Sequence, residues 1–321
     1  MATPLTLVLA PLRGFTDYIF RNAFCRHFDG FDSALAPFLS AASAARCKPV
    51  QIEDLLPENN HHLPVVPQIM TNRAPDFLGL AHLLADTGYD IVNWNLGCPY
   101  PMVAKKKRGC GLLPYPELID AFLDHVCAEI PGRISIKMRL GRYHAEEIDR
   151  LVPILNRYPL AEVIIHPRTG KQMYSGEPDL DAFEKCVAAI RHRIVFNGDL
   201  RSLERFNTVA GRVGGRVAGW MSGRGALIDP FLPAAIKRGG ESGDCKLERF
   251  KKFYDDLFDS YRRKLQGPGH LLDRMKGFWK YFSQAFENGG RIEKKVHRTH
   301  RMDHYLKIVN RFFEEDARWR E

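Results

Sequence analysis

Residues 89–99 read Tyr89-Asp-Ile-Val-Asn-Trp-Asn-Leu-Gly-Cys-Pro99, and this stretch holds the pattern that decides the fold. Its β-branched, apolar run predicts a strand, and the glycine and proline that follow predict a turn. Cys98 lies in that turn, where a thiol is exposed to a ligand rather than packed. The same arrangement, an apolar run followed at once by polar or glycine-rich residues, recurs along the chain and indicates a repeating architecture.

Eight such strand-like runs occur, at 5–10, 34–38, 65–70, 91–96, 134–139, 163–166, 194–197 and 217–222. Helical patterns separate most of them, for example at 74–87, 116–129 and 180–191. Strand–helix alternation predicts a parallel sheet with right-handed crossovers, and eight units in about 235 residues match a TIM (β/α)8 barrel. The alternative is a doubly wound open sheet, but the Gly-x-Gly-x-x-Gly motif that usually follows its first strand is absent.

A glycine-rich segment at 238–244 predicts a linker. Apolar residues at helical spacing follow it, at 247–265, 272–286 and 302–313. We therefore predict two domains, a catalytic barrel over 1–238 and a small all-helical domain over 245–321.

Composition narrows the class of protein. The net charge of +9 makes nucleic acid a reasonable partner, and residues 240–321 hold 19 Lys/Arg against 14 Asp/Glu. The seven cysteines show no Cys-x-x-Cys spacing, which argues against a disulfide scaffold or a metal site. No apolar stretch is long enough for a membrane span, and the N-terminus lacks a basic signal region. We expect a cytoplasmic protein without metal or membrane association.

Polar residues follow seven of the eight predicted strands, and a barrel collects such residues at one mouth. Asn197-Gly198-Asp199 and Gly223-Arg224 follow the last two strands, where such barrels commonly hold a phosphate. They predict a phosphorylated cofactor or substrate, although tight turns alone would also place glycines there. The other strand-end residues are Pro11, Gln68, Asn95 with Cys98, Lys137, and His166 with Arg168.

Three of these side chains have a structural alternative. Lys137 in an apolar strand meets an electron-rich ligand, forms an internal ion pair or lies on the outward face, because an unpaired buried charge is costly. His166 is either a ligand contact or a satisfied core histidine. Cys98 is either an inert core cysteine or, because an unperturbed thiol is mostly protonated at neutral pH, a general acid. The cationic run at 105–108 is either a solvated face or a grip on polynucleotide phosphates.

Taken together, these elements resemble the tRNA-dihydrouridine synthase family. The matching stretches are 9–17, Gln68, 95–99, Gly109 with 112–113 and 116–118, 137–141, 166–169, 197–199 and 223–227, which occur in the family's order. The segment Arg274-Met-Lys-Gly-Phe-Trp-Lys-Tyr281 looks most like the branch that modifies uridine 16 of the tRNA D-loop.

The resemblance implies an FMN-dependent enzyme that uses NADPH to reduce uridine to 5,6-dihydrouridine in tRNA. It implies hydride transfer from flavin N5 to C6 and protonation of C5 by Cys98. It places Pro11, Gln68, Lys137, His166, Asn197, Gly198, Asp199, Gly223 and Arg224 at FMN. It places Asn95 and Arg168 at the uracil edge, and the basic helices with Arg274, Lys276 and Lys280 at the RNA. We expect a monomer.

The chain departs from the family pattern at Leu12, Arg13, Trp94, Cys110 and 105–108. These departures leave another tRNA position or ribosomal RNA open as the substrate. A small-molecule FMN oxidoreductase of the dihydroorotate dehydrogenase type is a further alternative, but such enzymes lack a basic helical C-terminal domain. An RNA-binding protein with an inactive barrel is the third, against which the intact Cys98, Lys137 and His166 argue.

Overall fold

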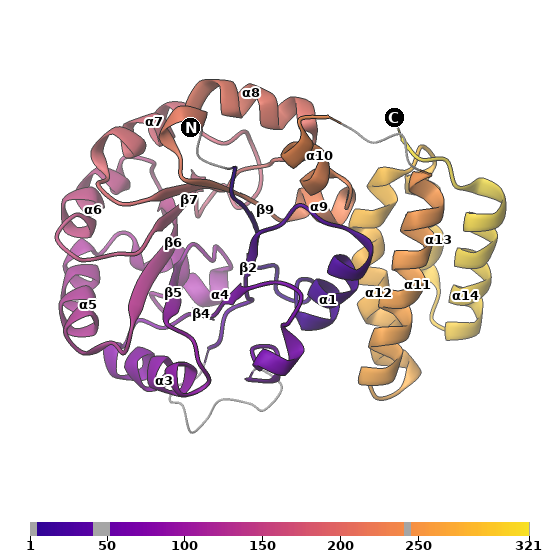
Figure 1. Ribbon diagram of the computed structural model, residues 1–321, viewed down its shortest axis with the longest axis horizontal. Helices are drawn as coiled ribbons and strands as arrows, with labels where there is room; N and C mark the ends of the chain where they lie inside the picture. The colour runs from indigo at the N-terminus through magenta and orange to yellow at the C-terminus, as the bar shows by residue number, and fades with distance from the viewer. Residues whose placement is uncertain (1–4, 41–51, 241–244, 321) are drawn as a thin grey trace.

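A computed structural model describes residues 5–40, 52–240 and 245–320 of the chain. Nine strand segments form one parallel sheet in the order β3-β2-β1-β9-β8-β7-β6-β5-β4, and Figure 1 shows helices surrounding it. The strands are β1 Leu7–Leu9, β2 Ser33–Leu35, β3 Val65–Val66, β4 Gln68–Ile69, β5 Ile91–Leu96, β6 Arg133–Gly141, β7 Val163–Thr169, β8 Ile194–Phe196 and β9 Gly219–Ser222. The predicted TIM barrel is confirmed.

The third predicted strand is split in two at Pro67, which has no N–H to donate. β3 pairs with β2 on one side, and β4 pairs with β5 on the other. A further bridge between Leu39 and Ile69 links the two sides. The sheet therefore closes through this interrupted strand, and all strand carboxyl ends point to one mouth.

The helices outside the sheet follow the predicted amphipathic pattern, with apolar faces turned to the barrel. They are α1 Tyr18–His27, α3 Ala74–Asp86, α4 Pro101–Ala104, α5 Pro116–Glu129, α6 Glu147–Leu155, α7 Leu180–Ala189, α8 Leu203–Val213, α9 Arg224–Ile228 and α10 Leu232–Arg238. In the described ranges, none of the helices is both long enough and apolar enough to span a membrane.

The C-terminal region is helical, as predicted, with one helix more than expected. It contains α11 Lys246–Lys264, α12 Pro268–Phe282, the short turn η5 Ser283–Ala285, α13 Gly289–Arg298 and α14 Met302–Arg311. α13 was not predicted because it begins with two glycines and has only two apolar side chains, Ile292 and Val296, both of them buried. Part of the predicted linker, 241–244, lies outside the described residues.

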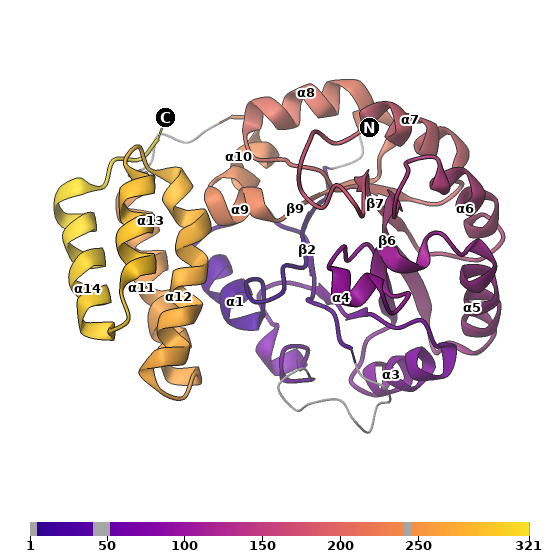
Figure 2. The same cartoon turned by 180° about the vertical axis from the view of Figure 1, so that it is seen from behind.

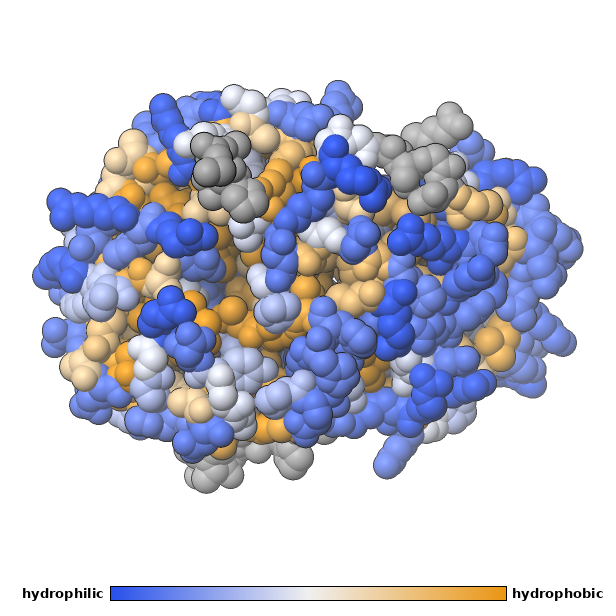
Figure 3. Space-filling view, in the orientation of Figure 1, coloured by the Kyte–Doolittle hydropathy of each residue, from blue (hydrophilic) through white to orange (hydrophobic). Residues whose placement is uncertain are grey.

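One hydrophobic core joins the barrel to the helical region. Phe20 of α1 contacts Phe253 of α11 and stacks on Phe278 of α12, with ring centroids 6.0 and 5.8 Å apart. Figures 1 and 2 both show α12 beside α1 and α9. The outer surface of the helices that Figure 3 displays is mostly hydrophilic. Apolar packing at this seam therefore fixes where α12 lies against the mouth.

Asp17 ties the seam together with its carboxylate. Its Oδ1 caps α1 by accepting from the Phe20 N–H at 3.2 Å and also accepts from the Tyr261 hydroxyl at 2.6 Å. The Arg274 guanidinium lies 3.5 Å from Oδ2 and donates to the Gly14 carbonyl. Arg274 was predicted to bind RNA, and it already bridges α12 and the loop after β1.

We expect Asp17→Ala to lower the free energy of unfolding by about 2–4 kcal/mol, because it removes a helix cap and leaves the buried Tyr261 hydroxyl unpaired. Asp179→Ala is the matched control, since Asp179 caps α7 through the Ala182 N–H and has no role at the seam. It should cost about 1 kcal/mol. Urea unfolding measures both, and equal losses would contradict the role of Asp17 at the seam.

Candidate active site

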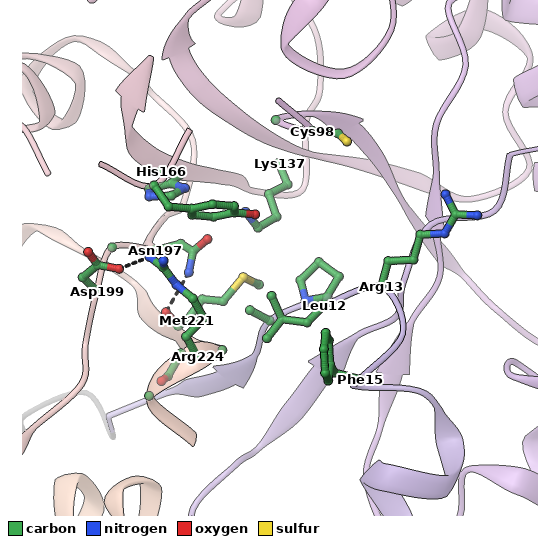
Figure 4. A pocket seen from close by; sticks show the side chains of 18 of the residues that line it. Leu12, Arg13, Phe15, Cys98, Lys137, His166, Asn197, Asp199, Met221 and Arg224 are labelled. Carbon is green, nitrogen blue, oxygen red and sulfur yellow. Dashed lines mark hydrogen bonds and ion pairs between the residues drawn. The ribbon is translucent and has the colours of Figure 1, made fainter. Parts of the chain in front are cut away.

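A cavity of about 490 Å³ opens at the carboxyl ends of the strands. Figure 4 shows side chains from several strands pointing into it. Twelve of the predicted site residues line it: Pro11, Gln68, Asn95, Cys98, Lys137, His166, Asn197, Gly198, Asp199, Gly223, Arg224 and Lys280. Arg168, Arg274 and Lys276 do not. The barrel thus brings together residues that lie as far as 269 positions apart in the sequence.

A chain of side-chain amides holds the turn that carries Cys98. Asn95 Oδ1 accepts from the Gly97 and Cys98 N–H groups at 3.0 and 2.9 Å. Asn95 Nδ2 then donates to Gln68 Oε1 at 2.7 Å.

The chain continues into the neighbouring strands. Gln68 Nε2 donates to Asn93 Oδ1, and Asn93 Nδ2 donates to the Ser135 hydroxyl, both at 2.8 Å. The N–H groups of Gly97 and Cys98 fix the orientation of every amide in this hydrogen-bonded series, because each amide must present its oxygen to the preceding donor. One Nδ2 hydrogen of Asn95 and one Nε2 hydrogen of Gln68 are left over for a ligand.

The Cys98 thiol is more buried than its turn predicted, with 8% of the residue exposed. Burial raises its pKa, against the opposing effects of a backbone hydrogen bond and the charge of Arg139. The thiol therefore stays protonated at neutral pH and is suited to give a proton.

Cys110, which the sequence left unexplained, lies close to Cys98 but outside the cavity wall. Its N–H donates to the Cys98 carbonyl at 3.1 Å. Burial raises its pKa to about 11. A Cβ added at Gly170 would come within 2.4 Å of the Cys110 sulfur. The Cys110 thiol therefore occupies the space that a side chain at position 170 would need.

Lys137 projects into the cavity from β6 (Figure 4). Desolvation first and the charge of Arg139 second lower the pKa of its ammonium to about 7. Within the described ranges the ammonium has no hydrogen bond or ion pair. Both structural alternatives, the outward face and the internal ion pair, are therefore wrong, and a cation remains available to an electron-rich group in the cavity.

Lys137 should make the free energy of unfolding of the ligand-free protein increase as the pH rises from about 7 toward 10. The unfolded chain keeps a proton on this lysine in that range and the folded protein loses it, so unfolding takes up a proton. Lys137→Met removes this dependence, so the stability gained by the variant should be larger at pH 7 than at pH 8.5. Urea unfolding of both proteins at the two pH values measures it, and parallel stability curves would contradict the assignment.

Asp199 organises the cations after β8. Its carboxylate pairs with Arg168 at 2.5 Å and with Arg224, and Arg201 lies 3.6 Å away. Burial alone would raise its pKa, but the hydrogen bond from Arg168 and the charge of Arg224 outweigh burial and lower it. Asp199 adopts a positive φ of 43°, which is uncommon for a residue other than glycine. Arg224, predicted to supply charge to a phosphate, is partly neutralised by Asp199.

His166 is held neutral by its neighbours. Desolvation and the charges of Arg139 and Lys137 lower its pKa well below the usual value. Arg168 donates from NH1 to His166 Nε2 at 3.1 Å. A guanidinium only donates, so Nε2 is the acceptor and the ring proton resides on Nδ1. Arg168 is itself 1% exposed and also donates to the Gly176 carbonyl.

The rim of the cavity is aromatic and basic, and most of its residues belong to the strand ends, loops and motifs that the sequence singled out. Lys280, Tyr281 and Gln284 reach it from α12 and η5. The barrel side adds Arg13, Phe15, Phe38, Tyr100, Arg139 and Tyr174. The cations stack on the rings: the Arg224 and Arg139 guanidinium carbons lie 4.4 and 5.4 Å from the Tyr174 centroid. The sequence analysis missed Tyr100, which directly follows the quoted motif at 95–99, and Gln284, and nothing in the sequence indicated the ring contacts.

The run at 105–108 is partly structural and does not line the cavity. Lys107 lies 4.0 Å from the Tyr115 ring centroid, and Arg108 donates to Asn72 Oδ1 at 3.5 Å. Lys105 and Lys106 are exposed. No group of three or more His, Cys, Asp or Glu side chains suited to a metal occurs in the described ranges.

The chain is similar to known proteins over most of its length. A family model described as dihydrouridine synthase (Dus) matches residues 8–320. A protein from Rhodobacter capsulatus named "Probable tRNA-dihydrouridine synthase" is 28% identical over 272 residues, covering 83% of this chain and 82% of that protein. A tRNA-dihydrouridine(16) synthase from Cupriavidus necator is 29% identical over 245 residues, covering 72% and 73%.

Among solved structures, the old yellow enzyme homologue from Zymomonas mobilis matches with a TM-score of 0.53 and 12% identity. The match covers 77% of this chain and 94% of that one, and at this identity it shows the shared barrel fold. The family match, by contrast, extends through the barrel and the helical region together. The resemblance seen in the sequence is confirmed, and the chain belongs to the dihydrouridine synthase family.

Proposed function

We propose that this protein reduces uridine to 5,6-dihydrouridine in tRNA, at position 16 of the D-loop, with FMN in the cavity and NADPH as the reductant. The observation that carries the proposal is that Lys280, Tyr281 and Gln284 of the basic helical region line the same cavity as Cys98 and Lys137. A small-molecule oxidoreductase of the dihydroorotate dehydrogenase type has no need of such a wall. We propose that the protein acts as a cytoplasmic monomer.

The residues present fit a phosphorylated, electron-rich cofactor. Lys137 lines the cavity, and its ammonium has no hydrogen bond or ion pair among the described residues, so it can meet an electron-rich group there. Gln68, Lys137 and His166 would hold the ring system, and Pro11 would contact it. The phosphate would lie at Asn197, Gly198, Asp199, Gly223 and Arg224. When bound, reduced FMN supplies a hydride.

The chain's own residues orient the base and deliver the proton. A uridine must leave its stack to enter a cavity at a barrel mouth. Cys98 is protonated at neutral pH and lies on the cavity wall, which supports proton donation to C5 of the uracil. Asn95 has one Nδ2 hydrogen to spare for the uracil edge. Arg168 was expected at that edge, but its burial supports a positioning role through His166 and Asp199.

The test is to incubate the purified protein with FMN, NADPH and an unmodified tRNA transcript, and to map dihydrouridine by primer extension after alkaline cleavage. We expect a flavin-containing yellow protein and one modified site at uridine 16, and a transcript with cytidine at that position should remain unmodified. Modification at another uridine or in ribosomal RNA would correct the position. Turnover of dihydroorotate instead of RNA would overturn the proposal.

A further inference from the structure

A second cavity, of about 200 Å³, lies beside the first in the seam between the barrel and the helical region. Arg201, Ile228 and Gln284 line both cavities, so the two are neighbours along one groove. Its walls come from the start of α8, the turn between α9 and α10, η5 and the end of the chain. Figure 1 shows α9 and α10 placed between the barrel and the helical region, near the C-terminus.

Four cationic side chains line this second cavity: Arg201, Arg238, Lys246 and Arg320. One carboxylate, that of Asp229, also lines it. Arg238 is exposed and forms no hydrogen bond or ion pair with any residue in the described ranges. Arg201 is 43% exposed, and its nearest carboxylate, Asp199, already pairs with two other arginines. Among the described residues, Arg238 therefore has no ion-pair partner and Arg201 has only a shared one, so both can take up an anion.

The floor of the cavity is rigid. Trp319 packs edge-on against Phe231, Phe250 and Phe286, with ring centroids 5.3 to 5.4 Å apart. The Arg320 N–H donates to the Ala285 carbonyl at 2.8 Å, and its guanidinium touches the Phe286 carbonyl only at 3.4 Å. The backbone of Arg320 is therefore held in place, and most N–H donors of its guanidinium have no hydrogen-bond partner among the described residues.

We propose that this second cavity is a phosphate-binding subsite that holds the ribose–phosphate backbone of the RNA next to the nucleotide in the first cavity. This inference rests on the proposed function. A nucleotide drawn into the first cavity brings its flanking phosphates to the rim, where a neighbouring basic hollow can receive one. Arginine forks match phosphate oxygens, and such contacts fix the register of the RNA without reading its sequence.

The experiment compares Arg238→Gln, Arg320→Gln and the double variant with wild type as holoenzymes. Arg150→Gln is the matched control, because Arg150 is exposed on α6 and lines neither cavity. Affinity for an unmodified tRNA transcript is measured from 50 to 300 mM KCl. Each lost phosphate contact should reduce the slope of log affinity against log salt by about 0.7, which is about fivefold in affinity at 0.1 M. The double variant should lose roughly 25-fold.

The same variants test whether the second cavity binds a phosphate of the RNA or a phosphate of NADPH. The rate at which NADPH reduces the bound flavin, followed by stopped flow without RNA, should equal that of wild type. KM for tRNA should rise while kcat is kept. A slower reduction by NADPH with unchanged RNA affinity would overturn the proposal and assign the cavity to the dinucleotide.

Equal RNA affinity and equal salt slope in all variants, with normal dihydrouridine formation by wild type, would refute the subsite alone. If wild type formed no dihydrouridine in any RNA, the proposed function would fail and this inference with it. Flavin content and urea unfolding of each variant confirm that the comparison is between folded holoenzymes.

Discussion

Cys98→Ala should lower the rate of dihydrouridine formation by about 10²–10⁴-fold, the range that a positioned general acid contributes. The thiol lies on the cavity wall, and burial raises its pKa, so wild type has a proton to give at neutral pH. Flavin content and reduction by NADPH should stay unchanged, because alanine removes one sulfur and leaves the backbone of the turn in place. Single-turnover assays with pre-reduced protein and tRNA measure the step directly.

Cys110→Ala is the control for the neighbouring thiol. It removes a buried sulfur that packs over Gly170, so it should cost some stability and leave the single-turnover rate within a few-fold of wild type. If Cys98→Ala kept wild-type activity, or if Cys110→Ala were the inactive variant, the assignment of the proton donor to Cys98 would be wrong.

The second large effect is expected from Asn95→Ala. This change removes the acceptor for the Gly97 and Cys98 N–H groups and cuts the amide chain to Gln68. Leaving buried donors and acceptors unpaired should cost about 2–4 kcal/mol of stability. The turn that carries Cys98 is then no longer fixed, so the rate should fall by about 10²-fold or more, since small misplacements of a reacting group are costly.

Asn95→Asp separates the structural role of this side chain from its contact with the base. A carboxylate still accepts from both N–H groups, and the chain through Gln68 and Asn93 can reverse because the Ser135 hydroxyl both donates and accepts. The variant should therefore unfold close to wild type and yet lose activity, because the spare Nδ2 hydrogen is gone. Full activity in Asn95→Asp would show that Asn95 acts only by holding the turn.

Much of the fold was predictable because its signals are local. The runs at 91–96 and 134–139 alternate apolar with polar residues over the length of a strand, and the structure places β5 and β6 there. Pro67 within the third run marked the break between β3 and β4, but the closure of the sheet through that break depends on pairing with two distant strands. α13 was missed because two glycines and a single buried pair give little periodic signal.

The sequence predicted which residues line the cavity better than it predicted the residues with which they form hydrogen bonds and ion pairs. Cys98, Lys137 and His166 line the cavity as expected, because parallel strands in a barrel end at one mouth. Arg168 and Arg274 were expected at the substrate, and the structure shows them bonded to His166 and Asp199, and to Gly14, respectively. A sequence shows that a residue is charged, but its partner is set by chain segments that meet only on folding.

The sequence by itself determined the barrel, the helical C-terminal region and the residues at the strand ends, since hydrophobic period and turn chemistry act over a few residues. Only the tertiary structure decided which charges remain available. It partly neutralises Arg224 with Asp199 and leaves Lys137 without an ion pair among the described residues. It also brings η5 and residues 319–320 beside α9 and α10, where they form the second basic cavity. Charge pairing and cavities depend on distances between remote segments, and apolar packing at the seam sets those distances.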